Sequence, residues 1–246
     1  MPQARSVLVV VLTLCLIGCT SIQRPFLFQP THNNVESTGL REWKLDGRTI
    51  GFARPVRSPQ NVWLMLHGNA GQAADRTYAL PAFSGRDAVF IMEYPGYGLR
   101  GGKPTKASFD AAATEAYLAL RKTFPNTPVC ILGESIGSGP ACSLATQAPP
   151  PDKIVLVVPF DKLTSVAARH VRFFPVSSIL EAKWNNIYSL STYKGPVEIF
   201  AALDDAVIPI QHAQSLAESI PAARFHPIPG GHNDWSSGNH VVIRNP

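Results

Sequence analysis

The sequence predicts an α/β fold with a mostly parallel, doubly wound sheet and helices on both faces. Short apolar runs typical of buried strands alternate along the chain with segments whose apolar residues recur at helical spacing, the pattern of such a sheet. One apolar run, Val129 to Leu132, leads through Gly133-Glu134-Ser135-Ile136-Gly137 into a helix-like stretch of small residues, Ser138 to Gln147. Functional residues are expected on the loops that follow the carboxyl ends of the strands.

Composition fits a single globular domain and excludes some classes of function. The 246 residues are 45% hydrophobic and 16% charged, which is enough apolar material for a large core. The formal net charge is +5, but Lys and Arg form neither a run nor a basic stripe. Nucleic acid is therefore not an expected partner. No two histidines stand at zinc-ligand spacing beside a carboxylate, so neither a metal nor another cofactor is expected.

The N-terminus is typical of a signal peptide. Arg5 precedes an apolar run from Val7 to Ile17, which is shorter than the ~20 residues that span a membrane. The run ends in Leu16-Ile17-Gly18-Cys19, which resembles the lipobox of bacterial lipoproteins. That resemblance implies a signal peptide over residues 1–18 and lipidation of Cys19, the first residue of the mature chain. A plain secretory signal that happens to contain a cysteine is the alternative.

The residues after Cys19 are predicted to hold the domain at a membrane. Thr20 rather than aspartate follows the cysteine, which resembles outer-membrane sorting in Gram-negative lipoproteins. We therefore expect a lipid-anchored protein of the cell envelope that faces the periplasm. Residues 19–40 show little periodicity and are predicted to be a tether for the domain, residues 41–246. Docking of Phe26-Leu27-Phe28 on the domain is the alternative for part of this tether.

The domain opens with a predicted antiparallel hairpin, in which Glu42 to Leu45 and Thr49 to Ala53 flank the turn residues Asp46-Gly47. Val62 to Leu66 is wholly apolar and is predicted to be a central strand. That strand delivers the glycine-rich loop His67-Gly68-Asn69-Ala70-Gly71 to the carboxyl edge of the sheet.

Two helices, with a strand between them, are predicted to follow the glycine-rich loop. A helix pattern over Arg76 to Phe83 precedes the next buried strand, Ala88 to Tyr94. The following helix is expected to have Ser108 as its N-cap, because its apolar positions keep helical spacing from there on. Pro125 ends that helix.

The second half of the chain continues the alternation. Ile154 to Val158, Val197 to Ala201 and Arg224 to Ile228 are the remaining predicted strands, and Gln211 to Ser219 is the last predicted helix. The irregular stretch 162–195 is expected to cover the site as a small cap. Its large apolar residues are Phe173, Phe174, Ile179, Leu180 and Trp184.

The serine motif predicts a strained turn between a strand and a helix. Glycines two residues before and after Ser135 let the strand and the helix approach closely, so that the apex presents its hydroxyl. The N–H groups at the start of the helix favour negative charge at that place. The alternative is that Ser135 is an ordinary turn residue of a nucleotide-binding type of loop.

The order and spacing of six motifs resemble the α/β-hydrolase superfamily. The resemblance is closest to its ABHD12/ABHD13/ABHD17-like branch and covers about residues 40 to 235. It implies an α/β-hydrolase fold and a serine hydrolase. Two departures are Arg100, where that branch usually has serine, and the short chain after His232, where the family has a long helix. The motifs are His67 to Gly71, Tyr94 to Pro104, Gly133 to Gly137, Pro159 to Asp161, Asp205 to Pro209 and His232 to Asp234.

The resemblance assigns a catalytic triad. Ser135 is the expected nucleophile, because a hydroxyl needs a neighbouring base to become reactive. His232 is the expected base and later acid, and Asp205 is expected to orient its imidazole. The chain order Ser, Asp, His is the one that this fold imposes. Asp161 and Asp204 also follow late strands and are the rival acids.

Backbone N–H groups of Ile136 and Asn69 are expected to form the oxyanion hole, since one follows the nucleophile and the other lies on the glycine-rich loop. His67 is expected to be structural. Glu134 is expected to face solvent or to pack on the loop rather than to take part in chemistry.

These observations predict a lipid-anchored serine hydrolase that cleaves carboxylic ester or thioester bonds through an acyl-enzyme intermediate. The expected partners are a small-molecule or lipid-like acyl substrate and a membrane. A non-catalytic envelope lipoprotein that keeps the fold as a binding module is one alternative. An exopeptidase is another, and it needs an acid in the cap to bind a substrate amine, for which Glu181 is the candidate.

Overall fold

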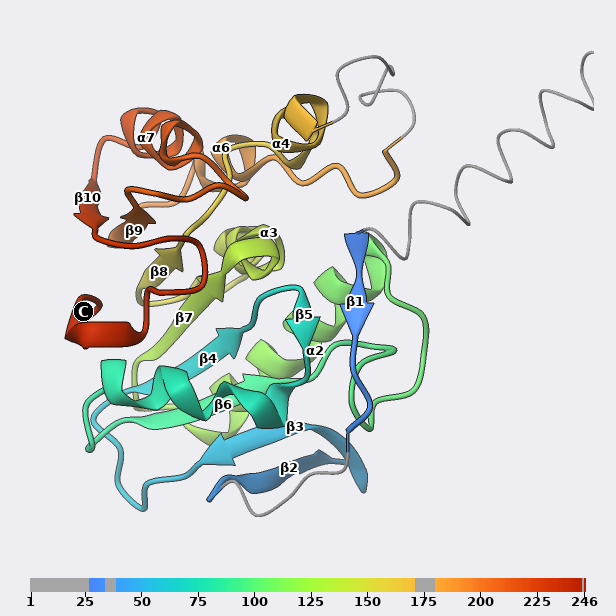
Figure 1. Ribbon diagram of the computed structural model, residues 1–246. Coiled ribbons are helices and arrows are strands. Elements are labelled where there is room, and N and C mark those ends of the chain that lie inside the picture. Colours follow the sequence, from blue (N-terminus) through green and yellow to red (C-terminus); the bar gives the residue numbers. More distant parts are fainter. Residues whose placement is uncertain (1–26, 34–38, 171–179, 245) are drawn as a thin grey trace, which may run out of the picture.

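The predicted α/β architecture is confirmed by the computed structural model, which describes residues 27–33, 39–170, 180–244 and 246 (Figure 1). An eight-stranded sheet has the order β10-β9-β8-β7-β4-β6-β3-β2. Strands β6, β4, β7, β8, β9 and β10 run parallel, and β3 pairs antiparallel with both β6 and β2. The strands are β1 Gln29–Pro30, β2 Arg41–Leu45, β3 Arg48–Arg54, β4 Val62–Leu66, β5 Ala70–Gly71, β6 Ala88–Met92, β7 Val129–Glu134, β8 Ile154–Val157, β9 Val197–Ala202 and β10 Ala223–Ile228.

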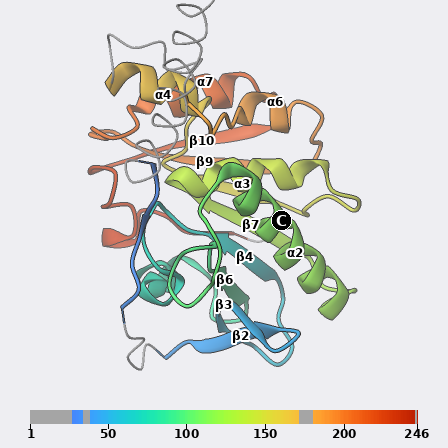
Figure 2. The ribbon, with the colours of Figure 1, turned by 90° about the vertical axis from the view of Figure 1, so that its right-hand side faces the viewer.

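Helices cover both faces of this sheet (Figure 2). One apolar core lies between the sheet and α2, α3, α6 and α7, and the other lies under η1 and the chain after β10. The helices are η1 Ala73–Ala82, α2 Lys106–Thr123, η2 Ser135–Gly137, α3 Ser138–Ser143, η3 Leu144–Thr146, α4 Leu163–His170, α6 Asn186–Leu190, α7 Ile210–Glu218 and η4 Ser237–Asn239, of which those marked η are 3₁₀-helices.

The α2 helix begins earlier than the sequence predicts. Thr105, not Ser108, is the N-cap, and its side chain accepts a hydrogen bond from the Ser108 N–H at 3.0 Å. The Ser108 hydroxyl in turn accepts one from the Thr105 N–H at 3.0 Å. This reciprocal capping box satisfies two N–H groups at once, which one cap at Ser108 does not.

The N-terminal segment lies partly on the domain. Phe28 is 5% exposed and its ring centroid lies 5.1 Å from that of Phe109. Gln29–Pro30 pairs with Ala70–Gly71 as a two-stranded sheet, and the sequence predicted neither strand. The docking alternative therefore describes this part of residues 19–40 better than a free tether does, because burial of an aromatic ring and a strand pair hold it in place.

The cap region 162–195 contributes α4 and α6. Phe173, Phe174 and Ile179 lie outside the described residues. Trp184 is 2% exposed and belongs to the core, where its indole N–H donates to Asp110 Oδ1 at 2.8 Å. It packs so closely on Gly139 that a Cβ there would lie 2.6 Å from the ring. Leu180 is buried in the same core.

The described residues after β10 contain no long helix, and buried side chains hold this segment on the domain. Trp235, Val241 and Ile243 are buried in the core under η1. The Ile243 N–H donates to the Ala82 carbonyl at 2.9 Å. This packing holds the loop that carries His232. The predicted signal peptide and Cys19 lie outside the described residues, within which no helix is long and apolar enough to span a membrane.

Candidate active site

Ser135 stands at a strained turn between β7 and α3. Its φ is 52°, in the left-handed region that a residue with a side chain rarely adopts. Two glycines make this turn possible: a Cβ at Gly133 would lie 2.6 Å from the Ala141 Cβ, and one at Gly137 would collide with the Leu66 carbonyl. The sequence prediction of a tight strand-to-helix turn at Ser135 is therefore confirmed.

The structure brings Ser135, His232 and Asp205 together in one chain of hydrogen bonds. His232 Nε2 lies 2.9 Å from Ser135 Oγ, and His232 Nδ1 lies 2.7 Å from Asp205 Oδ2. We assign the Nδ1–H tautomer, because a carboxylate can only accept. Nε2 is then free to accept the proton of the serine hydroxyl. The geometry is that of a nucleophile, a base and an orienting acid.

The orienting carboxylate is itself held in place. Asp205 Oδ1 accepts from the backbone N–H groups of Val207 and Ile208 at 2.8 and 2.7 Å. Of the rival acids, Asp161 contacts a different histidine, with Oδ1 2.8 Å from His212 Nδ1. Asp204 is exposed. Among these three acids only Asp205 contacts His232, which agrees with the prediction from sequence.

Asn69 and Ile136 line the same pocket as Ser135. Their N–H groups lie on the two segments expected to supply the oxyanion hole, the glycine-rich loop and the start of the helix after the nucleophile. The Asn69 side chain is half-buried, and its Oδ1 accepts a hydrogen bond from the Tyr97 hydroxyl at 3.0 Å. Their role as oxyanion donors stays a prediction.

His67 is structural, as expected from the sequence. It is fully buried, and its Nδ1 lies 2.7 Å from the Gly68 carbonyl. The Tyr94 hydroxyl donates to the His67 carbonyl at 2.9 Å. Burial lowers the pKa of His67, and the nearby Arg76 charge lowers it further. The imidazole is therefore neutral at pH 7.

Of the two alternatives expected for Glu134, exposure to solvent is wrong, because the residue is buried and packs on the glycine-rich loop. It is 7% exposed and its carboxylate accepts three hydrogen bonds of 2.9 Å. Their donors are the Gly68 N–H, the Tyr78 hydroxyl and the Trp235 indole N–H. One carboxylate beside Ser135 thus connects the glycine-rich loop, η1 and the segment after His232.

Arg76 and Tyr78 are site residues that sequence reasoning missed. The Arg76 guanidinium is buried and donates to the Ala70 carbonyl and, at 3.1 Å, to the Tyr78 hydroxyl oxygen. Burial and the Glu134 charge raise the pKa of Tyr78, so that its hydroxyl remains a donor. An arginine inside a predicted short helix was the only signal for this cluster.

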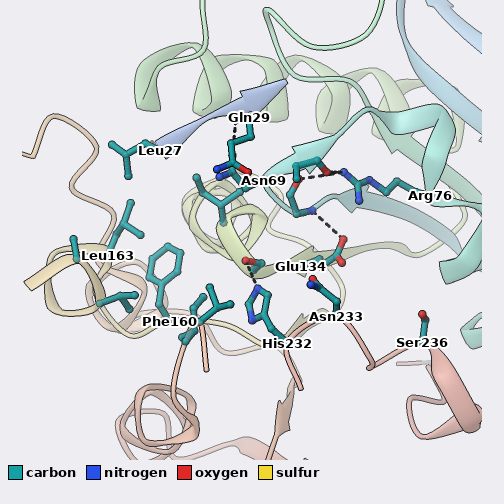
Figure 3. A pocket seen from close by; sticks show the side chains of 18 of the residues that line it. Leu27, Gln29, Asn69, Arg76, Glu134, Phe160, Leu163, His232, Asn233 and Ser236 are labelled. Carbon is teal, nitrogen blue, oxygen red and sulfur yellow. Dashed lines mark hydrogen bonds between the residues drawn. The ribbon is translucent and has the colours of Figure 1, made fainter. Parts of the chain in front are cut away.

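The pocket around Ser135 has two unlike walls and a volume of about 700 Å³. Figure 3 shows Leu27, Phe160 and Leu163 on one side of His232, and Arg76, Glu134, Asn233 and Ser236 on the other. Val166 and Ala167 of α4 extend the apolar wall. In the part of the chain that the structure describes, no group of His, Cys, Asp and Glu side chains could hold a metal ion.

The chain is similar to known proteins in sequence and in fold. No family model matches the chain. An uncharacterised protein of Mycobacterium tuberculosis is 31% identical over 176 residues, which are 70% of this chain and 62% of that relative. The lysophosphatidylserine lipase ABHD12 of Danio rerio is 27% identical over 189 residues, which are 67% of this chain and 48% of the lipase. The chain thus spans about half to three fifths of the length of these relatives.

The chain belongs to the α/β-hydrolase superfamily. Its named sequence relatives place it in the ABHD-like branch. Among solved structures, an esterase of Pyrococcus furiosus has a TM-score of 0.63 and 14% identity, and the match covers 85% of this chain and 91% of the esterase. At that identity the likeness extends to the α/β-hydrolase fold and no further.

We predict that Glu134→Ala lowers the free energy of unfolding by about 3 kcal/mol, because three donors lose a charged acceptor in a buried place. Urea denaturation followed by circular dichroism measures the change. Glu218→Ala removes an exposed carboxylate on α7 and is the matched control, with an expected change below about 0.5 kcal/mol. Equally small effects of both substitutions contradict the role given to Glu134.

Proposed function

We propose that this α/β-hydrolase is a serine hydrolase that cleaves carboxylic ester or thioester bonds through an acyl-enzyme intermediate. The observation that carries the proposal is the chain of hydrogen bonds from Asp205 through His232 to Ser135 at the strained turn. A hydroxyl in that setting lies in the pocket lining and has a base within 2.9 Å.

In the first half of the reaction the Ser135 oxygen attacks the substrate carbonyl carbon while His232 Nε2 takes the hydroxyl proton. The carbonyl oxygen becomes negative, and the N–H groups of Ile136 and Asn69 donate to it. His232 then gives its proton to the leaving oxygen or sulfur, the bond to that atom breaks, and the acyl group stays on Ser135. Water repeats the sequence on the acyl-enzyme, which releases a carboxylic acid and restores the serine.

The two walls of the pocket support an acyl substrate with a polar leaving group. An acyl chain fits against Leu27, Leu163 and Val166, because these side chains offer apolar surface. The opposite wall carries Arg76 and Asn233, which suit a polar or anionic alcohol. The name of one relative, a lysophosphatidylserine lipase, supports a lipid-like substrate of this kind.

An exopeptidase fits these walls less well. The cap acid considered for binding a substrate amine, Glu181, is exposed and is absent from the described pocket lining. Glu134 lines the pocket, but it already accepts hydrogen bonds from three donors. A substrate ammonium would compete with those donors for the same carboxylate.

Ser135→Ala should abolish covalent labelling by an alkyl fluorophosphonate and hydrolysis of p-nitrophenyl esters, because it removes the attacking oxygen. Gel fluorescence of the labelled protein and ester assays measure both, and circular dichroism checks that the variant folds. The wild type should cleave medium-chain esters faster than aminoacyl-arylamides. Labelling of the alanine variant would refute Ser135 as nucleophile, and a preference for arylamides would favour the exopeptidase.

Asp205→Asn should lower kcat by about 10⁴ with folding intact, because the amide leaves His232 in the wrong tautomer. Asp204→Asn changes the exposed neighbour and is the matched control, for which kcat should stay near the wild-type value. One medium-chain ester serves for both measurements. If Asp205→Asn retains wild-type kcat while Asp161→Asn or Asp204→Asn loses it, the assignment of the acid is wrong.

We also propose that Cys19 carries a lipid that holds the enzyme to the periplasmic side of a membrane. Leu27 in the pocket wall is the eighth residue after Cys19, so the two are at most about 29 Å apart. Such an anchor keeps the pocket close to lipid. Cys19→Ala should yield soluble or unprocessed protein in membrane fractionation, and wild-type protein that washes off membranes would contradict the anchor.

A further inference from the structure

The N-terminal strap, residues Leu27–Thr31, crosses the glycine-rich loop of the candidate site. The Gln29 N–H lies 3.1 Å from Asn69 Oδ1 and 3.1 Å from the Tyr97 hydroxyl oxygen. The Tyr97 hydroxyl donates to the same Asn69 Oδ1 at 3.0 Å. Two donors from different segments therefore fix the side chain of the residue whose N–H is expected in the oxyanion hole.

The strap is also bonded to the end of that loop and to Gly98 in the segment Tyr94 to Pro104. Gln29–Pro30 pairs parallel with Ala70–Gly71, directly after Asn69. The Thr31 N–H donates to the Gly71 carbonyl at 3.3 Å, and the Thr31 carbonyl accepts from the Gly98 N–H at 2.9 Å. The buried ring of Phe28 anchors the strap on Phe109. The loop is thus held by Glu134 from inside and by the strap from outside.

The first residue of the strap forms part of the pocket. Leu27 lies on the apolar wall, on the same side of His232 as Leu163 (Figure 3). A side chain at this place shields the apolar surface of a bound acyl chain from water. Shortening that side chain should therefore weaken the binding of long acyl chains more than that of short ones.

We propose that the strap is a working part of the site: Gln29 positions the oxyanion loop through Asn69, and Leu27 sets the preference for acyl length. The inference rests on the proposed ester or thioester hydrolysis. Gln29 is a positioning residue, because it acts through Asn69. An orientation error at an oxyanion donor lowers transition-state stabilisation and leaves ground-state binding nearly unchanged, so kcat should change and KM should not.

Two substitutions at one position test the positioning role in the full-length protein. Gln29→Pro removes the backbone N–H, whereas Gln29→Ala removes the same side chain and keeps the N–H. We expect kcat of the proline variant to be about tenfold below that of the alanine variant, with similar KM. Asn69→Ala, which deletes the acceptor and keeps its own N–H, should give a similar loss and decides the question if the proline variant fails to fold.

Acyl preference is tested by Leu27→Ala. The ratio of kcat/KM for p-nitrophenyl octanoate to that for the acetate should fall roughly tenfold. Leu118→Ala removes a leucine that is 45% exposed on α2 and is the control, with the wild-type ratio expected. A strap that only supports folding would lower both rates equally and leave the ratio unchanged.

The outcomes separate this inference from the proposed function. A wild-type protein that cleaves neither ester refutes the proposed function. An active wild type, together with equal kcat in the two Gln29 variants or an unchanged acyl ratio in Leu27→Ala, refutes the strap. A tenfold loss of kcat at constant KM and a shifted acyl ratio support it.

Discussion

The close approach of β7 and α3 at Ser135 is the constraint on which the site depends. Gly133 and Gly137 lie so near Ala141 and the Leu66 carbonyl that no side chain fits at either position. The helix therefore starts at the very end of the strand, and Ser135 is held at a φ of 52°. Packing on both sides compensates the strain. The hydroxyl that results stands at the carboxyl edge of the sheet, where the loops of the neighbouring parallel strands meet.

Around this turn the structure fixes its loops by hydrogen bonds to buried carboxylates. Asp205 accepts two backbone N–H groups and His232, and Glu134 accepts donors from three separate segments. Each of these two carboxylates, at the end of a strand or in the loop after it, holds several hydrogen-bond donors in place. A site fixed in this way needs little reorganisation when charge develops on a substrate, which is the physical basis of oxyanion stabilisation.

The N-terminal strap and the chain after His232 both contact loops of the candidate site. Trp235, Val241 and Ile243 bury the chain beyond His232 under η1, in place of the long helix that the resemblance leads one to expect. The N-terminal strap lies on the other side, across the glycine-rich loop. If Cys19 is lipidated, a short stretch of chain connects the membrane anchor to Leu27 in the pocket wall. The pocket would then lie close to the bilayer.

The main sheet, the turn at Ser135 and the chain order of Ser135, Asp205 and His232 could be predicted from the sequence. A fully buried strand such as Val62–Leu66, a serine between two glycines and an acid and a histidine after late strands are all local patterns. The surroundings of Glu134 and Arg76 and the docking of Gln29 depend on tertiary packing. The local sequence around Glu134 is the same whether its carboxylate faces water or accepts from three donors. Gln29 and Asn69 are 40 residues apart in the sequence. Contacts between segments that are distant in the sequence depend on how the helices and strands pack. Local residue patterns do not specify that packing.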